Sequence, residues 1–212
     1  GVAFSPNLKA YLFEVARLSQ FFNSKLVLIH VGNASEEKIE ALKIILDHFS
    51  NIDYEVVFKT GDPVDVILST SEEKQIDLLV LGALQRENFL KYYVGSIARK
   101  ITRRAKCSIL LLIKPSVERV SCRHVVVNGL EDPKTEQTIT SAFYVAKQLL
   151  AERITIVEEI KQNEVAVKVD DDKSLRKATI NKERLKLREE TRIKEIIAHI
   201  PEEYTRDIAI KS

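Results

Sequence analysis

A glycine and a serine that open a helical segment are the residues best suited to bind an anion in this sequence. An apolar run at 78–82 is typical of a strand, and Gly95 and Ser96 begin an apolar-periodic segment that ends in basic residues. At a helix N-terminus, unpaired backbone N–H groups and the positive end of the helix dipole converge on any anion in front of them. The pair therefore predicts a phosphate-binding turn, although Ser96 as an ordinary helix cap explains it equally well.

The spacing of these residues matches a known nucleotide motif. Gly82-x2-Gln85-x9-Gly95-Ser96 resembles the G-x2-G-x9-G-[S/T] motif of the universal stress protein (UspA) family, with Gln85 in place of one glycine. Three further segments resemble, in chain order, the family's first strand and turn, its second strand and the turn after its third strand: residues 1–6, 26–31 and 60–63.

The order of strand and helix patterns predicts an α/β fold. Short apolar runs alternate with amphipathic helical patterns, which is typical of a parallel sheet covered on both faces. The resemblance implies a doubly wound, five-stranded parallel sheet in the order 3-2-1-4-5, like that of the adenine nucleotide alpha-hydrolases. We expect strands at 2–5, 26–31, 54–59, 78–82 and 109–113, and helices near 8–22, 35–49, 64–74 and 96–104.

The rest of the chain reads as a partial repeat of the first half. We expect a universal stress protein domain over 1–116 and a second, divergent and incomplete copy over 117–212. The matching segments are a strand and turn at 123–129, a helix at 135–150, a strand at 153–157 and a third strand at 204–210. A long charged helical stretch lies within 168–200, and the copy has no counterpart of the Gly95 turn. Because Gly1 enters as if in mid-strand, we expect a longer parent chain.

The resemblance also implies a ligand and the residues that bind it. In family members that bind ATP, an aspartate after the first strand and the backbone after the second hold the nucleoside, and the glycine motif holds the phosphates. Carried over, the nucleotide-binding residues are Val31, Gly82, Gln85, Gly95 and Ser96. The implied ligand is ATP or another adenine nucleotide, with Mg.

Two departures from the family pattern weaken the case for ATP. Ala3 aligns with the aspartate and has no carboxylate, and Gln85 can either crowd the phosphates or donate to them. Asn128 takes the aspartate's place in the second copy, where its amide could hydrogen-bond a nucleoside. Three hypotheses follow: a nucleotide-responsive regulatory protein, a dimeric scaffold that no longer binds nucleotide, and a regulatory domain of a membrane transporter or kinase.

Composition gives no support to some partners. With 33 basic and 31 acidic side chains, the formal net charge of +2 makes no electrostatic case for nucleic acid or an anionic membrane. No apolar run is long enough to span a bilayer, and no leader opens the chain. We therefore expect a cytoplasmic protein.

Catalytic motifs are missing from the sequence, which contains no Gly-x-Ser-x-Gly elbow and no Walker loop lysine. We expect no enzyme, with slow ATPase activity as a remote alternative. The triplet at 170–172 lacks the ligand spacing of a calcium loop and is expected to be a solvated turn without metal. His30 is expected to be a partly buried structural residue. Cys107 and Cys122 are expected to be free thiols, with a single bridge between them left open.

The strand from Ile109 to Ile113 is expected at the edge of the sheet. A flat apolar edge strand must be covered or paired, and in this family that edge pairs with another copy. We therefore expect self-association, between tandem halves or between chains, through this strand.

Overall fold

The computed structural model describes residues 1–82, 95–158 and 172–211. The chain divides into two compact units, Gly1–Val120 and Ser121–Ser212, and each is described by itself. The expected boundary after residue 116 falls shortly before this division. That the second unit is a copy of the first remains a prediction.

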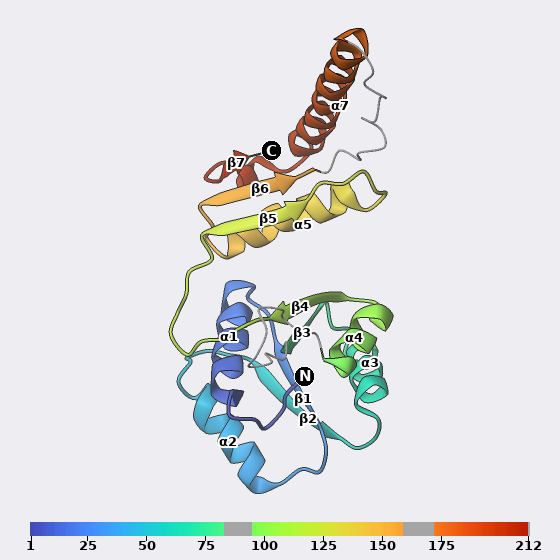
Figure 1. The fold of residues 1–212 in the computed structure, drawn as a ribbon. Coiled ribbons are helices and arrows are strands. Elements are labelled where there is room, and N and C mark those ends of the chain that lie inside the picture. The colour runs from blue at the N-terminus through green and yellow to red at the C-terminus, as the bar shows by residue number, and fades with distance from the viewer. Residues whose placement is uncertain (83–94, 159–171, 212) are drawn as a thin grey trace. The chain divides into compact units, whose positions relative to one another are not determined.

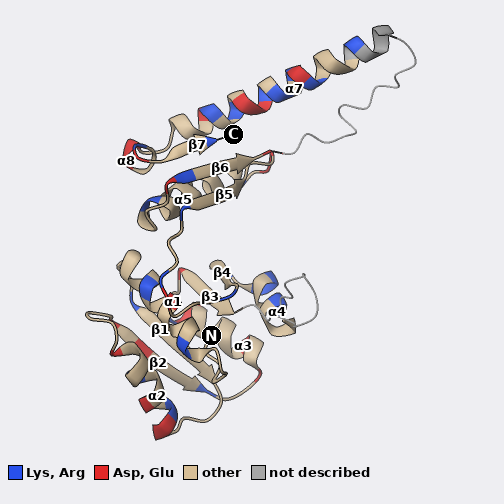
Figure 2. Cartoon of the chain, turned by 60° about the vertical axis from the view of Figure 1, so that its left-hand side comes forward, with Lys and Arg blue, Asp and Glu red and all other residues tan. Residues whose placement is uncertain are grey.

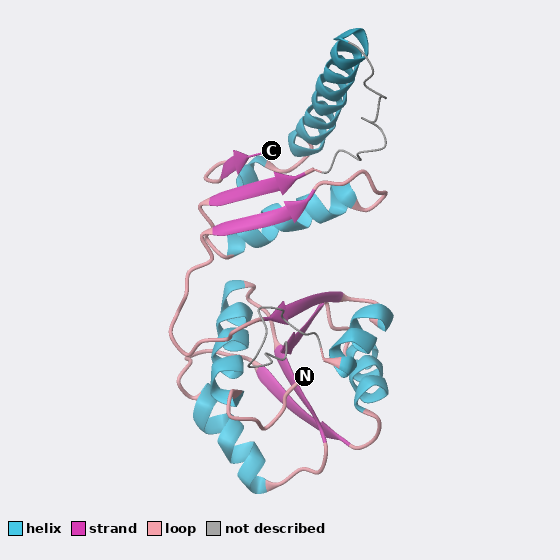
Figure 3. Cartoon of the chain, viewed as in Figure 1, coloured by secondary structure: helices cyan, strands magenta, loops and turns pink. Residues whose placement is uncertain are grey.

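The first unit is an α/β unit with parallel strands, as expected (Figures 1 and 3). Strand β1 (Leu26–Val31) pairs in parallel with β2 (Tyr54–Lys59), and β3 (Leu78–Gly82) pairs in parallel with β4 (Ser108–Leu112). The helices are α1 (Leu8–Phe21), α2 (Glu36–Leu46), α3 (Pro63–Glu73) and α4 (Ser96–Arg104).

The strand expected at 2–5 is wrong, because these residues form no ladder. The Val2 nitrogen donates to the Ile29 carbonyl at 2.7 Å, and the Gly1 nitrogen donates to the Val80 carbonyl at 3.1 Å. The segment therefore connects β1 with β3, where the expected first strand would lie. A turn begins immediately, since Ser5 N donates to Ala3 O at 2.9 Å, and it stops the pairing. The full five-strand order remains a prediction.

The described strands of the first unit form two two-stranded sheets, β1-β2 and β3-β4, and helices lie on both sides of these strands (Figure 1). Leu28 packs with α1 and α2, whereas the next residue, Ile29, packs with α3 and α4. This alternation follows from the pleat of a strand, which sends successive side chains to opposite faces. Helix α2 buries Leu42 and Leu46, whereas Ile39 in the same helix is 46% exposed.

Local capping fixes where α2 and α3 begin. Ser35 Oγ accepts from Lys38 N at 3.3 Å, and Asp62 Oδ1 accepts from Val64 N at 2.9 Å. Helix α4 differs, because its cap is Gly95, with no side-chain hydrogen bond, and Ser96 is the first helical residue. Ser96 as a helix cap is therefore wrong.

The second unit has a three-stranded parallel sheet in the order β5-β6-β7. Its strands are β5 (His124–Asn128), β6 (Arg153–Val157) and β7 (Ala209–Lys211), and its helices are α5 (Thr135–Gln148), α7 (Asp172–Ala198) and α8 (Glu202–Thr205). The strand expected at 204–210 is wrong in its first half. Tyr204 lies in α8, where it packs against the core and makes an edge contact with Tyr144. Across the described ranges, no helix is long and apolar enough to cross a membrane.

Candidate functional site

The predicted site residues lie where strands of the first unit end and α4 begins. Val31 ends β1, Gly82 ends β3, and Gly95 immediately precedes α4. In open α/β sheets, ligands bind beyond the carboxyl ends of the strands, where the winding reverses. Gly95 is buried and Ser96 is exposed. Gln85 lies outside the described residues.

The N-terminus of α4 offers hydrogen-bond donors to an anion. The first intrahelical bond runs from Arg99 N to Gly95 O at 2.9 Å, so the N–H groups of residues 96–98 precede it. The first turn of α4 contains no acidic residue, and its last turn contains Arg103 and Arg104. The positive end of the helix dipole is therefore not offset by a carboxylate within the helix.

A tyrosine that the sequence did not predict lies against the end of β3. A Cβ built on Gly82 would lie 2.6 Å from Tyr11 Cζ and 2.7 Å from Tyr11 Oη. Burial raises the pKa of the Tyr11 phenol above its ordinary value, so the phenol is neutral at physiological pH. Gly82 thus has a packing role in addition to the predicted phosphate role. Tyr11 lies in an ordinary amphipathic helix, where its type and position give no signal of this contact.

His30 and Lys38 form an ordered pair at the end of β1. His30 Nδ1 lies 3.0 Å from the Val2 carbonyl, and Nε2 lies 3.4 Å from Lys38 Nζ. Because a carbonyl can only accept, Nδ1 carries the proton and Nε2 accepts from the lysine. Lys38 Nζ also donates to the Asn33 carbonyl at 2.8 Å. His30 is half-buried and hydrogen-bonded on both nitrogens, which agrees with its expected structural role.

Close packing fixes the orientation of this pair. The Phe4 ring meets the His30 ring edge-on at 4.8 Å, and Lys38 Nζ lies 5.6 Å from the Phe4 centroid. A Cβ on Gly32 would lie 2.9 Å from His30 Nε2, and Gly32 has a φ of +152°. Only glycine fits both the backbone and the space at this position.

Lys38 adds a positive charge to this edge, next to the exposed carboxylates of Glu36 and Glu37. Lys38 is half-buried, and its described partners are a carbonyl and an imidazole, which satisfy hydrogen bonds without neutralising charge. Together with the α4 N-terminus, Lys38 makes the edge suited to an anionic ligand. Within the described ranges, no three His, Cys, Asp or Glu side chains gather as a metal site would require.

The corresponding edge of the second unit is filled by the protein itself. A Cβ on Gly129 would lie 2.6 Å from Ile156 Cγ2 and 3.3 Å from Ile193 Cδ1 of α7. Arg192 of α7 donates to the Gly129 carbonyl. Asn128 Oδ1 accepts from Leu130 N at 3.0 Å, so it is engaged in its own turn. The amide contact to a nucleoside considered for Asn128 is therefore not supported.

A half-buried carboxylate, Glu158, follows β6. Glu158 Oε1 is buried and has no hydrogen-bond partner among the described residues. Burial, and then the charge of Glu189, raise the pKa of the Glu158 carboxyl. This edge thus holds a partly desolvated acid, which opposes the binding of an anionic ligand.

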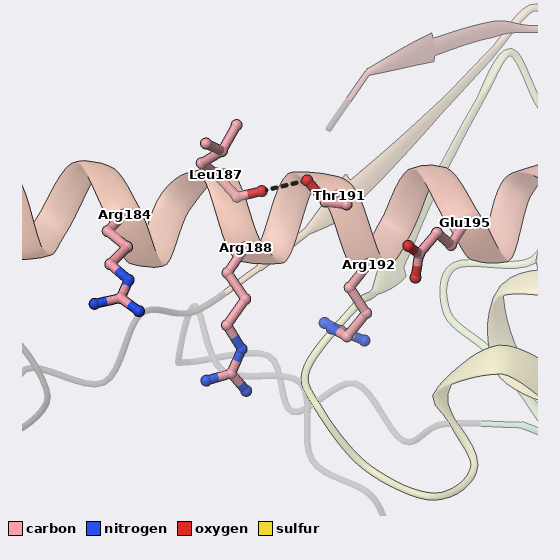
Figure 4. Close-up of a pocket in the computed structure, with 6 residues that line it drawn as sticks. All are labelled: Arg184, Leu187, Arg188, Thr191, Arg192 and Glu195. Carbon is pink, nitrogen blue, oxygen red and sulfur yellow. Dashed lines mark hydrogen bonds between the residues drawn. The ribbon is translucent and has the colours of Figure 1, made fainter.

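A hollow of about 440 Å³ lies along α7 of the second unit (Figure 4), whereas the predicted site residues all belong to the first unit. All of its lining residues come from this one helix: Arg184, Leu187, Arg188, Thr191, Arg192 and Glu195. A hollow on a single helix cannot enclose a small ligand, so we do not assign the nucleotide to it.

The two cysteines are free thiols and both are half-buried. Cys107 packs against the core between α3, α4 and β3. The bridge left open by the sequence is therefore not formed.

Comparison with known proteins places this geometry in a family. The family model described as "Universal stress protein family" matches residues 7–112. A universal stress protein of Methanothermobacter thermautotrophicus is 32% identical over 62 residues, which cover 29% of this chain and 42% of the relative. Another, from Methanocaldococcus jannaschii, is 31% identical over 58 residues, which cover 27% of this chain and 34% of the relative. The chain thus spans less than half of these relatives.

Among solved structures, a universal stress protein from Archaeoglobus fulgidus is similar to nearly the whole chain. The alignment has a TM-score of 0.57 and 18% sequence identity, and it covers 98% of this chain and 74% of the other. At this identity the similarity concerns the fold alone.

Proposed function

Because the chain belongs to the universal stress protein family, we propose that it is a stress-response regulatory protein that acts by binding an adenine nucleotide, partner proteins or both. The observation that carries the nucleotide proposal is the α4 N-terminus. It has no side-chain cap and no acidic residue in its first turn, and it lies in the segment where the family motif is expected to hold phosphates.

Each predicted residue has a role in this proposal. The N–H groups at the start of α4 and the Ser96 hydroxyl bind the phosphates, and Gly95 allows their close approach. The backbone at Val31 holds the nucleoside, and Gly82 keeps the end of β3 free of a side chain. Gln85 occupies the remaining motif position. Mg would enter with the phosphates of ATP.

We propose binding rather than turnover as the function. No described side chain beside α4 is arranged as a base next to a nucleophile, and the half-buried His30 already uses both of its nitrogens. Slow ATPase activity is the alternative, and an assay for released phosphate would reveal it. We place this function in the cytoplasm.

Thermal unfolding with and without excess Mg-ATP, ADP or AMP tests the proposal. A ligand that binds only the folded state at about a hundred times its dissociation constant adds about 2.7 kcal/mol to stability. The sharpest variant is Ser96→Asp, because an acidic residue in the first turn stabilises the helix by about 0.3–1 kcal/mol but repels phosphate. The uncharged control is Ser96→Asn. A nucleotide shift lost only in Ser96→Asp supports the proposal, and no shift with any nucleotide contradicts it.

The second candidate is a dimeric scaffold without nucleotide, favoured by the missing carboxylate at Ala3. Within the described residues β4 pairs only with β3, and Ile113 beyond it is 47% exposed. We propose that this edge pairs with the same edge of a second chain. Sedimentation of the wild type and of Ile113→Glu tests this pairing. We expect a dimer for the wild type and a monomer for the variant, and a dimer that persists in the variant would contradict the proposal.

A further inference from the structure

Helix α7 presents an outward face that the described residues of its own unit do not cover. Ile193, near its C-terminal end, is buried in the core, with Ile196 and Ile197 packed beside it. On the opposite side, Ile180 is 63% exposed and Leu187 is 64% exposed. These two side chains lie seven residues apart, which is two helical turns on one face.

Basic residues surround this apolar pair. The segment 172–188 contains seven basic and two acidic residues, a formal net charge of +5, and Figure 2 shows the blue positions along α7. Arg176, Lys182 and Arg184 are exposed, and none of them pairs with a described carboxylate. In Figure 4 Arg184 and Arg188 extend to the side of the helix opposite to Leu187. Arg176 and Arg184 lie four residues before and four residues after Ile180, so these two basic residues flank the apolar pair along the helix.

Helix α2 of the first unit carries the complementary pattern. The side opposite buried Leu42 and Leu46 is exposed and acidic, and Ile44 within it is 56% exposed. Its carboxylates are Glu36, Glu37, Glu40 and Asp47. None of the four pairs with a described cation, and Figure 2 shows the red positions at the start of α2.

We propose that the outward face of α7 docks on the acidic face of α2 in a second copy of this chain. An apolar centre within a charged rim is the usual build of a protein interface. The lengths are similar, since α2 spans roughly 17 Å and residues 176–188 span roughly 20 Å at 1.5 Å per residue. The proposal is independent of nucleotide binding.

Other partners fit this face less well. Two apolar side chains on four turns of helix are too few to insert into a bilayer, where a broad apolar face is needed. A nucleic acid backbone would leave Ile180 and Leu187 without apolar contact. An acidic protein helix with an exposed isoleucine provides carboxylates for the basic residues of α7 and an apolar contact for Ile180 and Leu187.

The contact joins two different surfaces and is small. Such a heterologous contact leaves one α2 face and one α7 face free on each pair, so assembly continues into chains or closes into rings. Two short helix faces bury less than a standard interface, which places the association in the weak, transient class. Its charged rim makes it sensitive to salt.

Sedimentation at several protein and salt concentrations tests the proposal, with Ile113→Glu in every variant to remove pairing through β4. The α7 variant is Arg176→Glu with Arg184→Glu, and the α2 variant is Glu37→Lys with Glu40→Lys. The control for the α7 variant is Lys9→Glu with Lys100→Glu, which makes the same change in net charge on other exposed helix surfaces.

The parent protein carries Ile113→Glu alone. We expect the parent and the control to associate at low salt, and we expect the α7 variant and the α2 variant each to remain monomeric when alone. An equimolar mixture of the two face variants should associate again, because the reversed α7 then meets a reversed α2. A parent that is monomeric at all concentrations overturns the proposal. So does association that survives in both face variants, or a mixture that stays monomeric.

Discussion

Tyr11 lies over Gly82 so closely that a Cβ at position 82 would fall 2.6 Å from the ring carbon Cζ. This contact joins α1 to the end of β3, at the edge where the nucleotide is proposed to bind. The contact explains why position 82, the first glycine of the motif, requires a glycine whether or not a ligand is bound.

We predict that Gly82→Ala destabilises the protein by about 1 kcal/mol or more, because the Tyr11 ring must leave its place. Urea denaturation measures the loss. In a double-mutant cycle, Tyr11→Ala should relieve most of it, with a coupling of about 0.5–3 kcal/mol. Strictly additive effects of the two substitutions would contradict the contact.

In the second unit, Gly129 lies similarly close to Ile156 and to Ile193 of α7, so this glycine allows α7 to pack against the end of β5. Gly129→Ala should cost about 1–3 kcal/mol, because the methyl group meets Ile156 and Ile193. Hydrogen exchange should show faster exchange in the last two turns of α7. The control is Gly61→Ala, which changes a glycine of the first unit and should leave exchange in α7 unchanged.

Glu158 makes the stability of the protein depend on pH. Burial raises the pKa of this carboxyl, so the folded state holds its proton more tightly than the unfolded state does. Its contribution to stability is present below the unfolded pKa and is lost as pH rises through the raised pKa. We predict that Glu158→Gln increases the free energy of unfolding near neutral pH and that this difference shrinks in acid. An equal effect at all pH values would contradict the prediction.

Restoring the carboxylate at position 3 should strengthen nucleotide binding. A hydrogen bond to a charged group contributes about 1.5–3 kcal/mol, so Ala3→Asp should tighten the affinity for adenine nucleotides by roughly tenfold or more. Ala3→Asn is the matched control without charge. Equal affinities of Ala3→Asp and wild type would show that the nucleoside does not reach residue 3.

Elements with strong local signals were predicted well from the sequence. The strands 26–31, 54–59, 78–82 and 153–157 are found with the expected bounds, because each is an apolar run between polar turns. The α3 start was readable, since Asp62 caps it and Pro63 follows. The strands predicted at 2–5 and 204–210 were wrong or only partly correct. Whether such a segment becomes a strand depends on backbone pairing with neighbouring strands, which a local sequence pattern does not reveal.

The site was predictable only where it is local. Gly95 and Ser96 announce the start of α4 by type and order. Tyr11 and the His30–Lys38 pair were missed as site features, because each contact joins residues from different elements. Their types are common in helices and strands, so neither composition nor periodicity marks them. The sequence placed Ser96 correctly at the start of α4 but did not show that Gly95 is the N-cap and Ser96 the first helical residue.

Calorimetric titration of Mg-ATP into the wild type, Ser96→Asn and Ser96→Asp tests the central claim most directly. The account predicts one nucleotide per chain for wild type and Ser96→Asn, because α7 fills the edge of the second unit, and strongly weakened binding for Ser96→Asp. No binding by the wild type, two nucleotides per chain, or unchanged affinity in Ser96→Asp would contradict it.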